Sequence, residues 1–564
     1  MGNSFARSFG YLRARCLLLF IIMALPATAL AGGFEYGPQG LHAVGRGGAF
    51  TAKADDASAM YWNPSKLSVL KGTHLLVNLN TSLLSLDFDR FPAQKRKVSQ
   101  DPETGALSYG DPVGDPIAFA TSSQNRGWFP MGISMALTSD FGLEDWGFGL
   151  SLNGPAAVGA VRYPGDKDAA TRYSTTELDT MVAYITAAAS YKYKEWFGFG
   201  LGLQYMVVPK LKYSLVIIGP AAYTNQNNPV NTINDLRADL SVSDWRGFTA
   251  LLGAWAKPLP WLEFGFNARI IPVKVKAKGD VKLKGTENSV YESLENPIQV
   301  GGKLEFNMPA TVQLGARYMF VRQDREIFDI EADFVWEQWS RMDAFRMATT
   351  EKAEGPGLAI EPMNIALERR WKDTYSVRLG GQWNAIPDWL TARLEGDGAV
   401  ETDWASDWLT ARLGGWWESA TQPNAYTTVD LPGFSRFGIG FGLSTSIYGF
   451  EIGMAYAHVF QMDRTVEAGT GLIRQQLVGP EIDENGRATM IEGYAVNEGK
   501  YQSSFDIITV GISVDWNKLI SKGRNTPPES DLPPDIGPAP ESEEPPTEID
   551  SEPEDQPEEV LDWM

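Results

Sequence analysis

Residues 45–67 read GRGGAFTAKADDASAMYWNPSKL. The stretch is rich in small and polar residues, so it cannot cross a membrane as a helix, which needs about 20 mostly apolar residues. It comes directly before residues 73–90, the first long segment in which apolar and polar residues alternate. We therefore expect residues 45–67 to fill the inside of another part of the fold, as a plug does.

The first residues have the pattern of a secretion signal. Arg7, Arg13 and Arg15 precede a short apolar core at residues 16–25, and small residues follow it. This order is typical of a signal peptide that is removed on export, and the core is too short for a stable membrane-spanning helix. We expect cleavage after Ala31 and a mature chain outside the cytoplasm.

Composition excludes several classes of protein. Cys16 is the only cysteine, so the mature chain would have no disulfide, no thiol nucleophile and no thiolate metal site. No later apolar run is long enough for a transmembrane helix. The 18 Trp, 20 Tyr, 27 Phe and 56 Gly instead suit a membrane barrel with aromatic girdles and a glycine-rich inner wall. A soluble secreted β protein is the alternative.

Alternation with a period of two recurs along the chain, as in Phe197, Phe199 and Leu201 against Gly198 and Gly200. A soluble barrel would turn the apolar face inward and a membrane barrel would turn it outward, so alternation alone does not decide the sense. The number and length of the segments favour a membrane barrel with both ends on the periplasmic side. We predict fourteen strands, at residues 73–90, 127–140, 146–163, 178–193, 197–215, 236–257, 261–283, 301–320, 326–345, 370–384, 388–418 (interrupted), 434–448, 450–465 and 500–516.

Several motifs follow one another in a fixed order. They are Asp55-Asp56-Ala57-Ser58-Ala59, Trp62-Asn63-Pro64, Asn153-Gly154-Pro155, Lys278-Gly279-Asp280, Pro309-Ala310-Thr311 and Trp336-Glu337-Gln338-Trp339-Ser340. In their order and spacing the chain resembles the FadL-type long-chain fatty-acid transporter family over most of residues 33–516. Ser65 stands where that family usually has alanine.

The resemblance implies an all-β fold, a transmembrane antiparallel barrel of about 14 strands with an N-terminal hatch inside it. The expected parts are a signal peptide (1–31), the hatch (32–72), the barrel (73–516) and an acidic tail (517–564). The expected location is the outer membrane of a Gram-negative bacterium, with outer-membrane lipid around the barrel and the barrel-assembly machinery inserting it. The hatch residues expected to take part in gating are Asp55, Asp56, Asn63 and Pro64.

Asn153, Gly154 and Pro155 interrupt the third predicted strand. Proline cannot donate to a strand ladder and glycine weakens one, so backbone groups should be left unpaired there. In lipid this is costly unless something covers the opening. The resemblance implies a kink that opens a side window into the bilayer, close to Asn63 of the hatch. The alternative is an ordinary loop between two short strands.

A carboxylate ligand would need an inward-facing cation. Strand parity places Arg269, Arg317 and Arg378 on the non-apolar face, and these are the candidate ligand-binding residues. An equally good interpretation is that they pair with inward-facing acids and fill the lumen. Those acids are Asp329, Glu331 and Asp333.

The net charge of −21 argues against nucleic-acid binding. Residues 525–564 contain fourteen Asp or Glu, ten Pro and no Lys or Arg, so we expect a disordered periplasmic tail that could bind a periplasmic partner. The heptapeptide DWLTARL occurs twice, at residues 388–394 and 407–413, and we have no functional interpretation of it.

The sequence therefore predicts passive uptake of a hydrophobic compound, with long-chain fatty acids as the first choice. The substrate would be captured at external loops, enter the barrel and leave sideways through the kinked third strand. Aromatic hydrocarbons are the alternative substrate, and a non-transporting structural barrel is the alternative of another class. We expect no enzyme activity, metal or cofactor, because the three histidines, His42, His74 and His458, form no catalytic or metal-binding pattern.

Overall fold

The computed structural model describes residues 37–100, 107–124, 130–154, 160–219, 232–292, 294, 296–322, 325–356, 358–385, 409–447, 449–478 and 493–523. One compact unit extends to Leu519, and residues 520–564 form a second. Most of the acidic tail, the signal segment and the first copy of DWLTARL thus lie outside the described residues. No described helix is long and apolar enough to cross a membrane.

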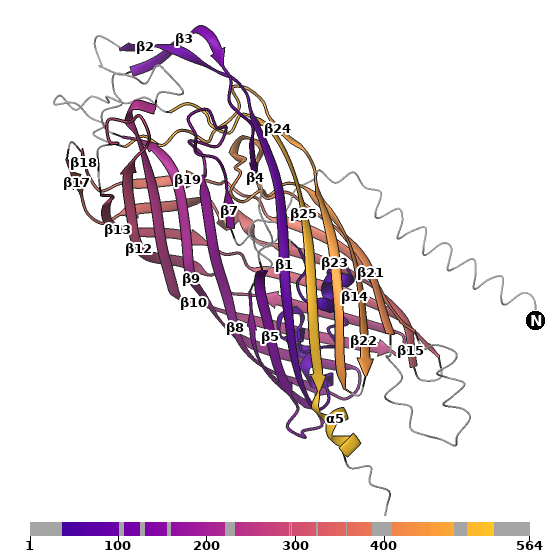
Figure 1. Cartoon of the computed structure of the whole chain (residues 1–564). Coiled ribbons are helices and arrows are strands. Elements are labelled where there is room, and N and C mark those ends of the chain that lie inside the picture. Colours follow the sequence, from indigo (N-terminus) through magenta and orange to yellow (C-terminus); the bar gives the residue numbers. More distant parts are fainter. Residues whose placement is uncertain are drawn as a thin grey trace, which may run out of the picture. The chain divides into compact units, whose positions relative to one another are not determined.

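The strands form one closed antiparallel sheet, a barrel of 14 strands, which confirms the predicted fold class and strand number (Figure 1). Closure is made by β1, which pairs with β5 on one side and with β25 on the other. Several barrel strands consist of two segments. The segments are β1 (Thr73–Arg90), β4 (Ser122–Gln124), β5 (Pro130–Ser139), β6 (Trp146–Asn153), β7 (Ala160–Arg162), β8 (Glu177–Tyr193), β9 (Phe197–Ile218), β10 (Asp235–Leu259), β11 (Leu262–Arg269), β12 (Lys274–Gly285), β13 (Ile298–Asn307), β14 (Thr311–Arg322), β15 (Arg325–Glu337), β16 (Ala344–Thr349), β19 (Asn364–Glu368), β20 (Thr374–Ala385), β21 (Leu409–Glu418), β22 (Arg436–Ile447), β23 (Phe450–Gln461), β24 (Arg464–Val466) and β25 (Gly499–Asp515).

Smaller elements lie outside this sheet. Two hairpins interrupt regions that the sequence predicts as loops, and short helices lie before β1 and in other connections. They are β2 (Ala93–Gln100) with β3 (Leu107–Ile117), β17 (Ala353–Gly355) with β18 (Leu358–Ile360), α2 (Leu41–Gly45), α3 (Ala59–Trp62), η1 (Pro64–Val69), η3 (Thr232–Asn234), η4 (Trp339–Arg341), η6 (Asn424–Tyr426) and α5 (Trp516–Gly523).

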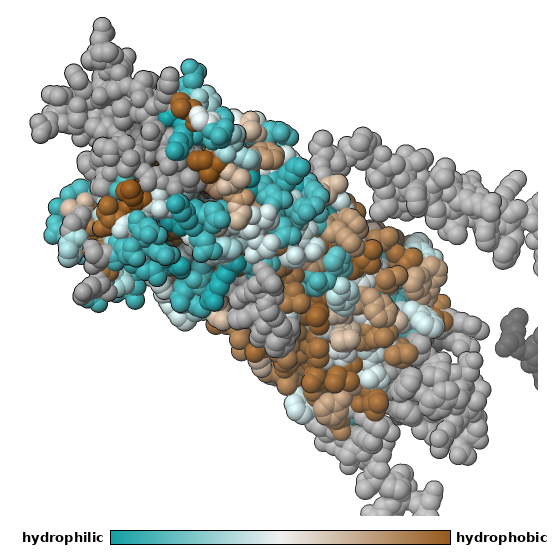
Figure 2. Space-filling view, turned by 45° about the horizontal axis from the view of Figure 1, so that its top comes forward, coloured by the Kyte–Doolittle hydropathy of each residue, from teal (hydrophilic) through white to brown (hydrophobic). Residues whose placement is uncertain are grey.

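The apolar face of the barrel points outward in the half that contains the short connections between strands. In β9, Phe199 is 53% exposed and Leu201 49%, whereas Gly200 and Gly202 between them are buried. The outward apolar stretch runs from Phe197 to Tyr205, which matches the length of a tilted transmembrane strand, about 9–11 residues. We call this half the lower tier, and its surface is that of a membrane barrel (Figure 2).

Beyond the lower tier the two faces exchange roles, and we call this half the upper tier. In β9, Leu211, Tyr213 and Leu215 are buried inside, and Lys212 is exposed outside. The exchange follows a β-bulge next to Pro209, because one extra residue turns all later side chains to the opposite face. The upper tier therefore encloses an apolar interior and presents a polar surface, as expected for a part that extends into water.

Residues 41–69, which we call the inner segment, lie within the lower tier. Helix α2 contacts β21, β22, β23 and β25, whereas η1 contacts β6, β8, β9 and β10 on the other side of the barrel. Wall glycines make this fit possible. A Cβ added to these glycines would fall 2.1–2.5 Å from an atom of the inner segment, at Gly147, Gly200, Gly265, Gly380, Gly414 and Gly440.

The glycine wall generates a prediction. In Gly414→Ala the new Cβ would lie 2.1 Å from the carbonyl oxygen of Arg46, so the inner segment or the wall must move. Overpacking of this kind typically costs about 1–3 kcal/mol. We expect a lower thermal unfolding midpoint than in Gly165→Ala, where the nearest atom lies at 3.6 Å. Equal midpoints for the two variants would contradict this account of the glycines.

Candidate functional site

The inner segment turns sharply at Asn63 and Pro64. Asn63 is fully buried, and its side-chain oxygen accepts a hydrogen bond from the backbone N–H of Ser65 at 3.2 Å, which caps η1. Pro64 occupies the first position of η1, where no N–H is needed. The Asn63 amide donates to the carbonyls of Thr51 (2.9 Å) and Ala254 of β10 (3.1 Å). These described bonds fix Asn63 to β10 rather than to the interrupted third strand.

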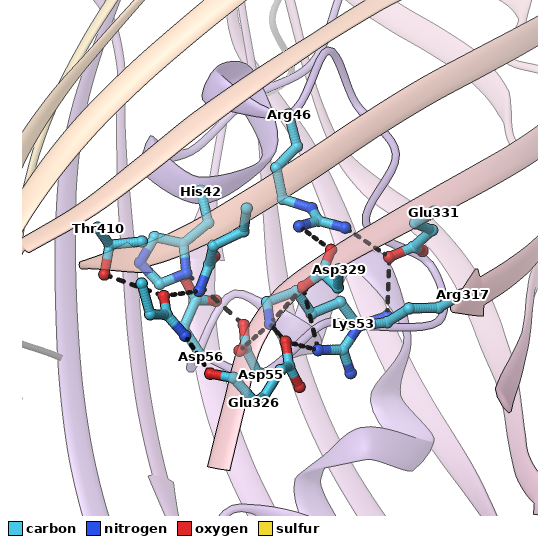
Figure 3. Close-up of polar contacts among 12 residues, drawn as sticks. His42, Arg46, Lys53, Asp55, Asp56, Arg317, Glu326, Asp329, Glu331 and Thr410 are labelled. Atoms are coloured by element: carbon cyan, nitrogen blue, oxygen red, sulfur yellow. Dashed lines mark hydrogen bonds and ion pairs between the residues drawn. The ribbon is translucent and has the colours of Figure 1, made fainter. Parts of the chain in front are cut away.

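A group of buried charges fastens the inner segment to one wall of the lower tier (Figure 3). Arg46 is fully buried and its guanidinium pairs with Asp329 at 2.6 Å and Glu331 at 3.1 Å. The ammonium group of Lys53 pairs with Asp329 at 2.9 Å and Glu326 at 3.0 Å. All three acids belong to β15, so one strand holds both cations of the inner segment.

Neighbouring strands complete this group. Arg317 of β14 pairs with Asp329 at 3.1 Å and with Glu263 of β11 at 3.0 Å, and Lys66 also pairs with Glu263. Removing one partner from a buried ion pair typically costs about 3–5 kcal/mol, since a charge is left unpaired in a medium of low dielectric constant. We call the following residues the clamp: Arg46, Lys53, Lys66, Glu263, Arg317, Glu326, Asp329, Glu331 and Asp333.

The same acids also bind the backbone of the inner segment. Asp333 accepts hydrogen bonds from the N–H groups of Phe50 and Thr51, both at 3.0 Å. Glu331 accepts them from Ala52 at 2.6 Å and Lys53 at 3.2 Å. These bonds satisfy buried N–H groups in a stretch without regular secondary structure. The position of residues 50–53 is therefore fixed by hydrogen bonds as well as by charge.

A second anchor lies at His42. Its imidazole contacts Glu451 of β23 at 2.8 Å and Asp56 at 3.2 Å. Burial lowers the pKa of His42 and so does the nearby Arg412, but the surrounding carboxylates raise it further, to about 9. His42 is therefore a cation at neutral pH. Asp56 also accepts a hydrogen bond from the N–H of Ser58 at 2.8 Å, at the start of α3.

Asp55 belongs to the same region. Its carboxylate lies 3.0 Å from the ammonium group of Lys53 and 3.7 Å from His42. Asp55 and Asp56, which the sequence singles out as hatch residues, therefore join the clamp to the His42 anchor.

The wall across the barrel from the clamp is apolar. Met60, Trp62 and Leu67 of the inner segment pack in one cluster with Leu76 of β1, Ala136 of β5 and Ala188 of β8. Such contacts have no fixed partner geometry, so they can be exchanged for contacts with another apolar molecule more easily than an ion pair can. The inner segment is thus held by charge on one side and by apolar packing on the other.

The predicted third strand runs along this apolar wall as two segments. β6 ends at Asn153, which pairs with Tyr184 of β8, and β7 resumes at Ala160, which pairs with Asp179. Gly154 follows β6 without regular structure, and Pro155 lies outside the described residues. Residues 180–183 of β8 have no described partner on this side. We call the interval between β6 and β7 the wall gap.

The three candidate arginines have different surroundings. Arg317 is part of the clamp. Arg378 donates to the carbonyl oxygen of Gly48 at 3.3 Å and lies 5.7 Å from the Trp62 ring, so it also supports the inner segment. The guanidinium of Arg269 lies 4.7 Å from the ring of Tyr184, the residue beside the wall gap. The lumen-filling interpretation thus describes Arg317, whereas Arg269 faces the gap wall.

The upper tier contains a cation that the sequence analysis missed. Arg90, at the end of β1, is 6% exposed; its Nη2 donates to the carbonyl oxygen of Ala495 at 2.8 Å, and its guanidinium lies 4.0 Å from the Phe119 ring. Its Nη1 is buried and has no hydrogen-bond partner, and Arg90 has no ion pair, among the described residues. Strand parity could have placed it inside, but its cover comes from segments far away in sequence.

A second arginine accompanies it. Arg464 of β24 lies 4.8 Å from the Phe434 ring and donates to the carbonyl oxygen of Gln422 at 2.9 Å. Both guanidiniums interact electrostatically with Tyr501 of β25, whose ring stacks on Phe88 at 4.3 Å. We call Arg90 and Arg464 the upper arginine pair. Among the described residues, no group of His, Cys, Asp or Glu side chains is arranged to hold a metal ion.

The clamp predicts how the inner segment opens. Asp329→Asn weakens the pairing of Arg46, Lys53 and Arg317, so we expect the inner segment to leave its wall more often. A reporter cysteine at the buried position of Ala57 (Ala57→Cys) should then react with a thiol reagent about a hundredfold faster, from the cost of an unpaired buried charge. Protein with Cys16 alone gives the background rate.

The matched control is Glu354→Gln, which removes an exposed ion pair with Lys352 and should leave the rate unchanged. An unchanged rate in a folded Asp329→Asn variant would show that the clamp does not hold the inner segment.

Comparisons with known proteins agree with the barrel and its inner segment. A family model described as outer membrane protein transport protein (OMPP1/FadL/TodX) matches residues 22–393. No curated protein matches the sequence.

Solved structures resemble the fold. A Pseudomonas aeruginosa FadL homologue is 15% identical, with a TM-score of 0.61 over 86% of this chain and 100% of that chain. The Ralstonia pickettii toluene transporter TbuX is 13% identical, with a TM-score of 0.55 over 85% and 98%. The P. putida toluene transporter TodX is 14% identical, with a TM-score of 0.54 over 85% and 99%. The chain belongs to the OMPP1/FadL/TodX family of outer membrane transport proteins, and is a transporter of hydrophobic compounds rather than an enzyme.

Proposed function

We propose that this protein carries long-chain fatty acids into the outer membrane, with the inner segment as a movable hatch. The observation that supports a fatty acid over an uncharged hydrocarbon is the upper arginine pair. Arg90 is buried among aromatic rings and has no carboxylate partner among the described residues. An unpaired buried guanidinium is costly, and a ligand carboxylate would satisfy it.

The surroundings of the pair suit the rest of such a ligand. Inward-facing side chains of the upper tier are apolar or aromatic, including Phe88, Leu215 and Tyr501. An acyl chain would find apolar contacts there and its carboxylate would find the arginines. An aromatic hydrocarbon would use the apolar contacts alone, so the arginines distinguish the two substrates.

The upper tier must open for the substrate to enter. The cavity beside Tyr173, Tyr213 and Arg369 has a volume of about 20 Å³, room for water but not for an acyl chain, since ligand pockets usually measure about 300–1,000 Å³. Arg369 there is paired with Asp430, and this pair lowers the pKa of the Asp430 carboxyl despite its burial. Entry therefore requires movement of the external segments rather than diffusion through a standing channel.

The path out follows from the asymmetry of the lower tier. The clamp side resists movement, whereas Met60 and Trp62 meet the gap wall through apolar contacts. A shift of α3 would exchange these contacts for contacts with the substrate and leave the clamp intact. The substrate would then pass between β6 and β7 into the bilayer, past Arg269 and Tyr184. Nothing in this route uses an energy source, so transport is passive.

Uptake measurements test the proposal. Cells that lack their own transporter should take up labelled oleate when they contain this protein. Arg90→Gln should lower oleate uptake about tenfold, since hydrogen bonds to a charged group contribute about 1.5–3 kcal/mol, and should leave toluene uptake unchanged. The control is Arg162→Gln, an arginine with a 67% exposed side chain.

The other outcomes are informative as well. Toluene uptake without oleate uptake would assign the protein to hydrocarbons. An equal loss of both substrates in Arg90→Gln, with normal insertion in the membrane, would make Arg90 a structural residue. No uptake of either substrate by the correctly inserted wild-type protein would overturn the transport proposal for both.

A further inference from the structure

The outer surface of the upper tier has a strongly basic side, over β12 and β13. Along β12 the inward residues Val275, Ala277, Val281 and Leu283 are buried. The outward residues alternate with them, and they are almost all lysines. With the lysine of β13 that lies beside them they form the lysine face: Lys274, Lys276, Lys278, Lys282, Lys284 and Lys303.

This concentration is unusual for the chain as a whole, whose net charge is −21. Two of the lysines have carboxylate partners, since Lys274 pairs with Glu305 at 2.6 Å and Lys284 with Asp239 at 3.8 Å. The other four have no ion pair among the described residues. The lysine face therefore has charge to spare for an external anion.

The strand register adds a second observation. Lys278 of β12 stands directly opposite Lys303 of β13, and both side chains are exposed on the outer surface. Like charges directly opposite each other in a ladder destabilise a sheet. Lys276, two residues away on the same side, has no ion pair either. An anion between these lysines would turn the repulsion into attraction.

The position of the lysine face indicates the kind of anion. The apolar outer surface ends at Ile270 and Ile271, which are 47% and 43% exposed, and Lys274 follows three residues later. A strand rises about 3.3 Å per residue, so Lys282 lies about 26 Å further along β12. The face thus begins at the upper edge of the membrane band and continues into the hydrophilic surface beyond it (Figure 2).

We propose that the lysine face binds the phosphate groups of lipopolysaccharide in the outer leaflet of the outer membrane. Phosphates on the lipid and on its inner sugars lie at successive heights above the acyl chains, as the lysines do along β12. Ammonium groups bind phosphate as point charges, without the fixed geometry that an arginine fork requires. The bound lipid would hold the barrel at a fixed depth and fill the surface beside β12.

The test uses the full-length protein in detergent and fluorescent lipopolysaccharide as the probe. The triple variant Lys276→Gln, Lys278→Gln, Lys303→Gln should raise the Kd at least about tenfold, because each basic residue near an anionic membrane surface contributes roughly fivefold. High salt should reduce the difference between variant and wild type. Lipopolysaccharide treated with phosphatase should bind the wild type as weakly as it binds the variant.

A control with the same change of charge is Lys352→Gln, Lys372→Gln, Lys500→Gln, which alters exposed lysines on other sides of the protein. It should leave the Kd within about twofold of wild type, since these lysines are distant from the lysine face. Equal losses in both triple variants would mean that only net charge matters. An unchanged Kd in the first variant, or full binding of phosphate-free lipid, would also overturn the proposal.

Discussion

Charges inside a membrane barrel must be neutralised, because no water or lipid headgroup can reach them at low cost. In the lower tier the acids of β15 have their partners on the inner segment, so Arg46 and Lys53 are as much a part of the wall as of the segment. The wall glycines depend on the same arrangement. They allow the backbone of the inner segment to come close enough for Asp333 to accept hydrogen bonds from Phe50 and Thr51.

The same constraint gives the barrel two unlike sides. Where charges are buried, the inner segment is fixed, and where the contacts are apolar, it can move without leaving a charge unpaired. The wall gap lies on the apolar side, next to the residues that pack against Met60 and Leu67. A hydrophobic substrate needs such a route, since it loses nothing by replacing one apolar contact with another. The upper tier repeats the theme, with an apolar interior and a polar surface.

Much of the fold could be predicted from the sequence, because alternation in the strands is a local property. Strand β1 begins and ends at the predicted residues, Thr73 and Arg90, and the strand number is confirmed. The exchange of faces could not be predicted. In β9, apolar residues keep to odd positions from Phe197 to Ile217, and the bulge at Pro209 alone turns the later ones inward.

The candidate site could be predicted in part. The inner segment was found from its composition, and the pairing of Arg317 with Asp329 was one of two interpretations left open. The binding of Asn63 to β10 and the burial of Arg90 both depend on segments that are distant in sequence. No periodicity or motif carries such information, because it arises only when the barrel closes.

The most direct test of the lateral route is a photoreactive long-chain fatty acid added to cells that contain the protein, followed by mapping of the crosslinked residues. The account predicts crosslinks inside the upper tier, at residues such as Leu215, and then along residues 180–183 beside the wall gap. Crosslinks that instead continue past Val69 and Leu70 to the periplasmic end, with none at residues 180–183, would contradict it and indicate a path straight through the barrel.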